Sequence, residues 1–272
     1  SLVRMEGGWH ILRTDTPWLH VLRGLLIVIA NMTFFAALAV LPLAEATAVF
    51  FVAPLMITLL SIPLLGEKVG PMRLGAVVVG LLGVVIMTRP WESGAGREVS
   101  FVVYLLPVVA ALTYALNQVL TRRLGVASKA SAMAVYIQGT FIVVSLVFWA
   151  VAGDGRFSEG LSNGSLVFLL RAWTWPEGGD IWLFIGLGLD SAVIGYCLSA
   201  AYRAADVAVV APFEYVGLPL AIFWGWIVWG ELPGPVVLAG IALILGAGLF
   251  VFLRERQSKR RLVTGRRIHR RY

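Results

Sequence analysis

The sequence predicts an all-α protein built as a polytopic transmembrane helical bundle. Of its 272 residues 59% are hydrophobic and only 14% are charged, and the mean hydropathy is +0.87. A soluble domain carries roughly 45–50% apolar and 25% charged residues. A water-soluble fold of this length could not hide the excess, because it still needs a polar surface. The apolar residues also occur in runs long enough to cross a bilayer.

Eight apolar runs are predicted to be membrane spans. A helix of roughly 20 residues crosses a 30 Å hydrocarbon core and satisfies its own backbone hydrogen bonds. The runs are too long and too uniformly apolar for barrel strands. They cover residues 19–41, 47–65, 72–88, 102–120, 130–152, 181–202, 207–229 and 236–253.

The distribution of basic residues predicts the orientation. If the N-terminal segment is cytoplasmic, all but four of the 22 Lys and Arg residues lie on the cytoplasmic side. Cytoplasmic segments of membrane proteins are enriched in these residues. We therefore expect a multi-pass protein of the cytoplasmic (inner) membrane with both ends cytoplasmic. The four exceptions are Arg89, Arg97, Arg156 and Arg171.

The C-terminal segment 254–272 is a basic tail, with nine Lys and Arg residues against the single acid Glu255. A basic block beside a span is typical of contact with anionic lipid headgroups. We expect the partners of this tail to be anionic lipids of the bilayer, and we expect no nucleic acid.

Cysteine and histidine usage argues against metal and haem chemistry. Cys197 is the single cysteine, so no intrachain disulfide or thiolate cluster can form. The histidines His10, His20 and His269 lie near or beyond the ends of the runs. We expect no cofactor, no metal and no enzymatic activity, and the absence of a phosphate-binding loop argues against ATP-driven transport.

A short apolar segment, 166–175, lies in the long loop between the fifth and sixth spans. It is too short to cross a bilayer. It is either an interfacial helix anchored by Trp173 and Trp175 or part of an irregular loop.

An internal repeat predicts the architecture. The pattern G-E-x-x-G-P occurs at residues 66–71 and again at 230–235. The first copy follows the second span and the other follows the seventh, so an odd number of spans separates them. Copies placed in this way lie on opposite faces of the membrane, as in inverted-topology repeats.

The second repeat contains five spans and the first contains three. We therefore expect inverted five-helix repeats with eight of ten spans present and the first two absent; a native eight-span protein is the alternative. The predicted domains are an incomplete first repeat (1–90), a linker (91–101), a second repeat (102–253) and the basic tail (254–272).

The repeated motif has a structural explanation. Gly ends a helix in the left-handed conformation and Pro begins the next one. Glu45 and Asp206, upstream of the two copies, are predicted to lie at helix starts, where the helix dipole favours an acid. The motif therefore indicates architecture and does not mark a substrate site.

Three stretches, 22–67, 110–124 and 208–235, together resemble the drug/metabolite transporter superfamily of EamA type. The resemblance covers essentially the whole chain. It implies ten helices in two inverted five-helix repeats, a central cavity, and alternating access without ATP hydrolysis. The chain departs from the family pattern by lacking the first two helices, and in the family the first of these helps to line the cavity.

Two carboxylates within the spans are candidate sites for substrate or proton binding. Asp190 lies near the bilayer midplane, and no basic residue is at a similar depth in any span. It is expected either to bind a proton or a cationic substrate group, or to form a hydrogen bond between helices. Glu214, beside Tyr215, lies between Pro212 and Pro219, so its helix is predicted to be kinked. Such a kink either forms a substrate site or only packs helices, with Glu214 facing interfacial water.

Weaker candidates are Asn31 and the pair Tyr114 and Asn117, which share one helical face. These residues either line a cavity or join helices. The sequence thus predicts a secondary transporter of a small organic metabolite (amino-acid-like, nucleoside-like or drug-like), with proton coupling as a hypothesis. The alternatives are a non-transporting helper subunit and a lipid-acting membrane enzyme; a homodimer is left open.

Overall fold

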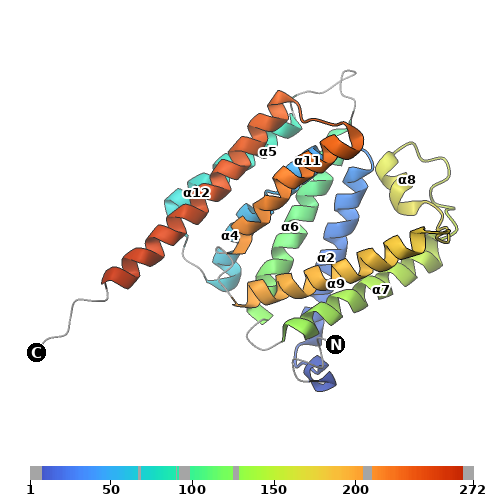
Figure 1. Ribbon diagram of the computed structural model, residues 1–272, viewed down its shortest axis with the longest axis horizontal. Helices are drawn as coiled ribbons and strands as arrows, with labels where there is room; N and C mark the ends of the chain where they lie inside the picture. Colours follow the sequence, from blue (N-terminus) through green and yellow to red (C-terminus); the bar gives the residue numbers. More distant parts are fainter. Residues whose placement is uncertain are drawn as a thin grey trace, which may run out of the picture.

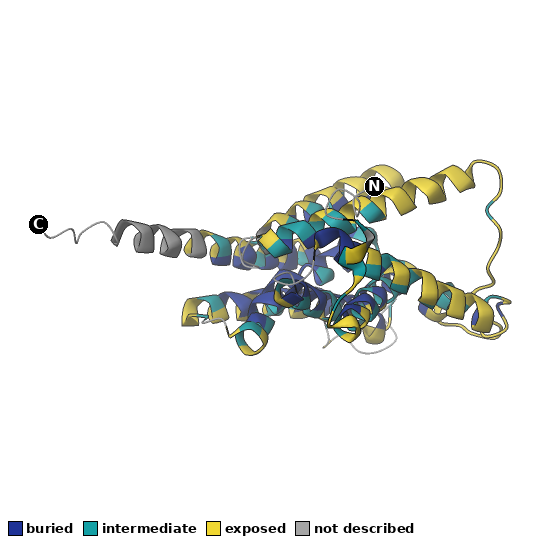
Figure 2. Ribbon diagram, turned by 90° about the horizontal axis from the view of Figure 1, so that it is seen from below, coloured by how far each residue is buried: buried dark blue, intermediate teal, exposed yellow. Residues whose placement is uncertain are grey.

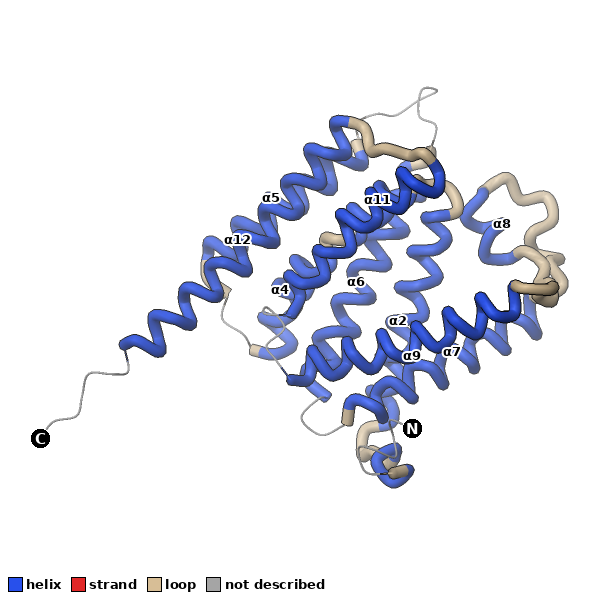
Figure 3. Tube along the Cα trace, viewed as in Figure 1, coloured by secondary structure: helices blue, strands red, loops and turns tan. Residues whose placement is uncertain are grey.

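A computed structural model describes residues 8–66, 69–89, 91, 99–124, 129–204 and 210–265. The described part is helical, without strands (Figures 1 and 3). Seven of its helical segments are long and apolar enough to cross a membrane, if residues 43–65, which contain α3 and α4, are counted as one; a shorter apolar helix covers 213–229. This confirms the predicted polytopic bundle. The elements are η1 (Trp9–Leu12), α2 (Pro17–Leu38), α3 (Leu43–Phe50), α4 (Ala53–Leu65), α5 (Pro71–Thr88), α6 (Phe101–Leu124), α7 (Ala130–Ala152), α8 (Gly164–Leu170), α9 (Asp180–Ala204), η2 (Ala211–Val216), α11 (Gly217–Trp229) and α12 (Pro235–Gly265).

Two of the expected spans are interrupted. The second span consists of α3 and α4, and the seventh consists of the 3₁₀ helix η2 followed by α11. A proline lies in the first turn of α4 (Pro54) and of η2 (Pro212). Proline has no backbone N–H, so Pro54 cannot continue the hydrogen-bond ladder of α3 into α4. The second span is therefore divided between α3 and α4, which the sequence analysis did not predict. Around Glu214, where a kink is predicted, the 3₁₀ helix η2 changes to α-helix at Gly217.

The acidic helix start predicted for the first repeat is confirmed. Helix α3 begins at Leu43, directly after Pro42, and Glu45 lies in its first turn. The Glu45 carboxylate accepts a hydrogen bond of 3.1 Å from Tyr104 Oη. Asp206, the corresponding acid of the second repeat, lies outside the described residues.

The repeated G-E-x-x-G-P motif turns the chain between helices as predicted. Gly66 ends α4 with φ 70° and Gly230 ends α11 with φ 71°, both in the left-handed region. Pro71 is the first residue of α5 and Pro235 the first residue of α12. Glu67 lies outside the described residues, and Glu231 is exposed.

The short apolar segment forms α8, which contacts α2. Asn163 caps its start, because the Asn163 side chain accepts hydrogen bonds from the backbone amides of Ser165 and Leu166. The helix ends at Leu170, so Trp173 and Trp175 lie beyond it, and Trp175 is 90% exposed. A helix is therefore present, but the two tryptophans are not part of it.

The bundle has two dense regions. The last helices of the two predicted repeats, α5 and α12, pack on one another at one side of the molecule, and α2 packs on α6 and α7 (Figure 1). Helices α7 and α9 lie side by side at the other side. Buried residues concentrate in the middle of the bundle and exposed ones on the peripheral helices (Figure 2). The exposed apolar side chains of α9, such as Trp182 and Leu183, suit contact with lipid.

Candidate functional site

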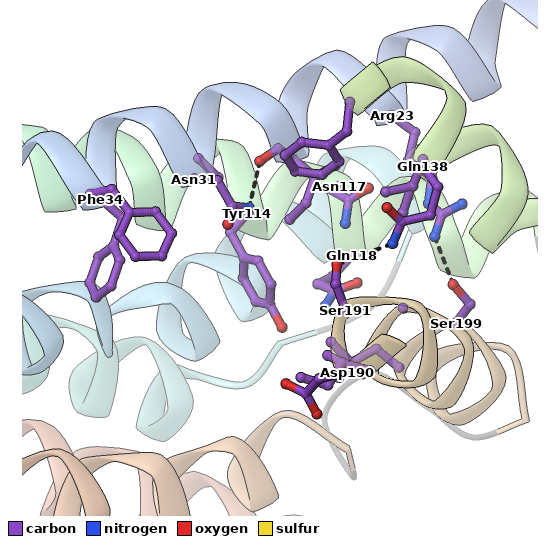
Figure 4. Close-up of a pocket in the computed structure, with 18 of the residues that line it drawn as sticks. Arg23, Asn31, Phe34, Tyr114, Asn117, Gln118, Gln138, Asp190, Ser191 and Ser199 are labelled. Atoms are coloured by element: carbon purple, nitrogen blue, oxygen red, sulfur yellow. Dashed lines mark hydrogen bonds between the residues drawn. The ribbon is translucent and has the colours of Figure 1, made fainter. Parts of the chain in front are cut away.

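A cavity of about 560 Å³ lies among α2, α6, α7 and α9, with one side chain from α3. Its size is within the range of about 300–1,000 Å³ that holds small organic ligands. Figure 4 shows polar and aromatic side chains from these helices facing one another. The lining residues are Arg23, Ile27, Ala30, Asn31, Phe34, Phe35, Phe50, Tyr114, Asn117, Gln118, Ile137, Gln138, Phe141, Leu187, Asp190, Ser191, Ile194, Gly195, Leu198 and Ser199.

The lining combines aromatic rings with amides. Five of the lining residues are Phe or Tyr, and four are Asn or Gln. Within this wall the rings of Phe50 and Tyr114 meet edge to face, 5.3 Å apart between centroids, and Phe34 lies 5.3 Å from Phe50. Rings stack on planar ligands, and amides both donate and accept hydrogen bonds. The cavity is thus suited to a flat, polar organic molecule.

Four of the six candidate residues predicted from the sequence line this cavity. They come from three different helices: Asn31 from α2, Tyr114 and Asn117 from α6, and Asp190 from α9. The Asn31 amide Nδ2 also donates a hydrogen bond of 2.9 Å to the Ile27 carbonyl. The prediction that Tyr114 and Asn117 share a face is confirmed, since both contribute to the same wall.

Asp190 is exposed. None of the hydrogen bonds or ion pairs found among the described residues involves its carboxylate, so the alternative of a bond between helices is not supported. The adjacent residue does form such a bond: Gln138 Nε2 of α7 donates to Ser191 Oγ of α9 over 3.1 Å. Asp190 is therefore available to the cavity, because its side chain contributes to the lining.

Glu214 lies behind the cavity wall, half-buried, and does not line the cavity. Its Oε1 accepts hydrogen bonds from Tyr114 Oη of α6, at 2.8 Å, and from Tyr202 Oη of α9, at 2.6 Å. Both hydroxyls contact the same carboxylate oxygen, so Glu214 joins η2 to α6 and α9. Tyr114 contacts both Glu214 and the cavity, so the carboxylate is connected to the cavity through one side chain.

Tyr215 is a packing residue and not part of the cavity. Its side chain is buried, and its ring lies 5.7 Å from that of Phe51. Gly248 of α12 leaves the space that the ring fills, since a Cβ atom there would overlap it. The neighbouring position on η2 therefore points Tyr215 toward α12 while Glu214 points toward α6 and α9.

Arg23 was not among the predicted site residues. It is 2% exposed and lines the cavity. Its guanidinium donates from Nε to Thr121 Oγ1 (2.6 Å), from Nη1 to the Met133 carbonyl (3.2 Å) and from Nη2 to Ser199 Oγ (2.9 Å). The signal was present in the sequence, because an arginine within an apolar span marks a functional candidate. Arg23 lies near the cytoplasmic end of its span, so it contributed to the predicted orientation and not to the predicted site.

Within the described residues, no group of three or more His, Cys, Asp or Glu side chains could hold a metal ion. The side chains that line the cavity offer hydrogen-bond donors and acceptors, aromatic rings and the charged groups of Arg23 and Asp190.

Comparison with known proteins identifies the family. Residues 5–89 match the EamA-like transporter family. The chain is 32% identical over 254 residues to a riboflavin transporter of Rhizobium johnstonii, covering 93% of this chain and 76% of that protein. It is 26% identical over 251 residues to an S-adenosylmethionine uptake transporter of Rickettsia prowazekii, covering 92% and 77%.

A solved crystal structure shares the fold with a TM-score of 0.63 at 22% identity, over 94% of this chain and 82% of the other. Together with the helical bundle and the cavity, the relatives confirm the resemblance seen in the sequence and the expectation of a transporter rather than an enzyme. The chain belongs to the EamA-like transporter family of the drug/metabolite transporter superfamily.

Proposed function

We propose that this protein is a secondary transporter that moves a small heteroaromatic metabolite across the cytoplasmic membrane by alternating access. The observation that carries the proposal is the cavity of about 560 Å³ with its wall of aromatic and amide side chains. It lies between α2 of the proposed first repeat (1–90) and three helices of the proposed second repeat (102–253). Transporters with inverted repeats bind their substrates at such an interface.

The substrate class follows from the lining. The rings of Phe34, Phe50 and Tyr114 offer stacking surfaces to a flat heterocycle. The amides of Asn117 and Gln138 offer donors and acceptors to its polar edges. Flavins and adenine derivatives have this combination of features. The relatives named for riboflavin and for S-adenosylmethionine support the same class.

The proposed movement takes place at the two interrupted spans. The break between α3 and α4 and the change from 3₁₀ to α-helix between η2 and α11 occur in corresponding spans of the two proposed repeats. In inverted-repeat transporters, interrupted helices at corresponding positions commonly form the binding site around which one repeat rocks against the other. Rocking of one repeat against the other at these breaks would open the cavity to either side in turn.

Glu214 is the proposed site of proton coupling. As an anion it accepts hydrogen bonds from Tyr114 and Tyr202, which holds η2 to α6 and α9. Protonation removes the charge that strengthens these two bonds. Because Tyr114 also lines the cavity, a proton on Glu214 alters the substrate site.

The placement in the membrane is also proposed. The positive-inside pattern supports a protein with both ends in the cytoplasm. Helix α12 extends as far as Gly265, beyond its apolar window, so the basic segment starts as a helix leaving the bilayer. Its side chains beyond Arg254 lie outside the described residues, and contact with anionic lipid remains a prediction.

Uptake into proteoliposomes tests these statements. We expect accumulation of riboflavin or S-adenosylmethionine driven by a pH gradient in the wild type. Glu214→Gln should lose the gradient-driven accumulation and keep exchange of labelled for unlabelled substrate, because the amide cannot take up the proton. Glu159→Gln, at an exposed loop position, is the matched control and should behave like the wild type.

Two results would count against the proposal. Wild-type uptake that does not respond to the pH gradient would remove the proton coupling while leaving transport intact. Absence of uptake of either heterocycle would remove the proposed substrate class.

A further inference from the structure

Arg23 is a buried cation whose described partners are all neutral. Its three hydrogen bonds go to two hydroxyls, of Thr121 and Ser199, and to the backbone carbonyl of Met133. An arginine side chain remains charged and carries five N–H donors, so two donors, on Nη1 and Nη2, are left over. A buried charge is costly unless an opposite charge compensates it.

The compensating charge does not come from the nearest acid of the cavity. Asp190 lies on α9 nine residues before Ser199, which corresponds to about 13 Å along a helix. Among the described residues no ion pair joins Asp190 to Arg23. Figure 4 shows the two side chains at separate positions in the cavity. Arg23 is therefore a positive charge that faces a ligand-sized space.

A second buried group at this end of the cavity has one atom without a hydrogen-bond partner among the described residues. Asn117 is 3% exposed and lines the cavity, and no hydrogen-bond partner contacts its Oδ1 atom. Buried polar atoms are nearly always hydrogen-bonded, so an unpaired acceptor facing a cavity points to a donor on a ligand. Asn117 lies one helical turn before Thr121, whose hydroxyl accepts from Arg23.

We propose that Arg23 binds an oxyanion of the transported substrate, a carboxylate or phosphate, and that Asn117 Oδ1 accepts a hydrogen bond from a donor near that group. The ligand class is thus a heteroaromatic metabolite that carries a terminal anionic group, with its ring against the Phe and Tyr side chains. This inference rests on the proposed transport function and adds the anionic group to it. The competing explanation is that Arg23 only joins α2 to α6, α7 and α9.

Matched pairs of ligands separate the two explanations. Flavin mononucleotide differs from riboflavin by a terminal phosphate, and S-adenosylmethionine differs from its decarboxylated form by a carboxylate. We would measure the affinity of the purified protein for all four by calorimetry. The wild type should bind the anionic member of at least one pair about 10- to 100-fold more tightly, as expected for hydrogen bonds to charged groups. The pair that shows the preference identifies the anion as phosphate or carboxylate.

The variants then assign the preference to Arg23. Arg23→Gln should lose the preference while retaining its affinity for the member without the anion. Arg23→Lys should retain part of it, because the charge remains but the forked geometry does not. Arg122→Gln is the matched control: Arg122 is a half-buried arginine at the end of α6, outside the cavity, and its loss should leave the preference unchanged.

Three other results would overturn the anion site or the substrate class. A wild type that binds both members of each pair equally would overturn the anion site and leave the transport function standing. This measurement needs no variant, so misfolding of Arg23→Gln does not affect it. Equal weakening of both members by Arg23→Gln would assign Arg23 to helix packing and overturn the proposal. Failure of the wild type to bind any of the four ligands would reject the proposed substrate class itself.

Discussion

Glu214 joins three helical segments through one carboxylate oxygen. Tyr114 Oη of α6 and Tyr202 Oη of α9 both donate to its Oε1, and Glu214 itself lies on η2. The two tyrosines differ in one respect: Tyr114 lines the cavity and Tyr202 does not. The two bonds to Glu214 are therefore expected to have separable roles: both contribute to stability, and only that of Tyr114 also affects the cavity.

Replacing each tyrosine by Phe tests this separation. Tyr202→Phe should lower the free energy of unfolding by about 1.5–3 kcal/mol, the usual contribution of a hydrogen bond to a charged group. It should leave ligand affinity unchanged. Tyr114→Phe should lower both stability and affinity. Thermal unfolding in detergent with and without riboflavin measures the two effects; a Tyr202→Phe protein as stable as the wild type would show that its bond to Glu214 contributes nothing.

At the scale of helices, α5 and α12 approach closely because of glycine. A Cβ atom at Gly83 would lie 2.8 Å from the carbonyl oxygen of Gly240 and 3.1 Å from Ile244 Cγ1. Around Gly246, also on α12, no atom lies within 4 Å of the corresponding position. Small residues allow such close packing of helices in membranes.

The glycine contact predicts a matched pair of variants. Gly83→Ala should destabilise the protein by about 1–3 kcal/mol, because backbone must move to admit the methyl group. Gly246→Ala should be neutral or slightly stabilising, since alanine is favoured over glycine within a helix by about 0.5–1 kcal/mol. Unfolding in detergent measures both. Equal stability of the two variants would contradict the packing described for α5 and α12.

The turn after α11 depends on a different property of glycine. Gly230 has φ 71°, in the left-handed region, whereas Gly234 in the same turn has no positive φ, and both have open space around them. Gly230→Ala should therefore cost about 1–2 kcal/mol of stability through backbone strain alone. Gly234→Ala should cost less. Chemical denaturation compares the two, and a Gly230→Ala protein as stable as Gly234→Ala would argue against the left-handed turn.

At the scale of the whole molecule, the cavity lies between elements of the two proposed repeats, so its accessibility should change when they move. Replacement of the single native cysteine by Cys197→Ser provides a background for labelling. In that background Asn31→Cys places a thiol in the cavity wall. We expect saturating riboflavin or S-adenosylmethionine to slow its reaction with a water-soluble maleimide.

The control for this labelling is Glu159→Cys, at an exposed loop position outside the cavity. Its reaction rate should not respond to either ligand. If the ligand slows both thiols equally, or neither, the cavity is not where the ligand binds.

The sequence alone determined the apolar spans, the turns at the repeated motif and the family. Apolar runs of bilayer length must be helical because lipid offers no hydrogen bonds to the backbone. The ends at Gly66, Pro71 and Gly230 follow from local backbone preferences that need no distant partner. The candidates Asn31, Tyr114 and Asn117 could also be found, because a polar side chain within an apolar run stands out.

Only the tertiary structure decided which of these side chains meet. It places Asp190 at an exposed edge of the cavity, Glu214 behind Tyr114 and Tyr202, and Arg23 inside the wall. The reason is physical. Local composition determines which apolar run contains a residue and how deep it lies in the membrane. Which neighbour its side chain contacts depends on the direction it points from the helix axis and on where the other helices pack. The cavity exists because α2, α6, α7 and α9 come together, and no single segment of the sequence encodes it.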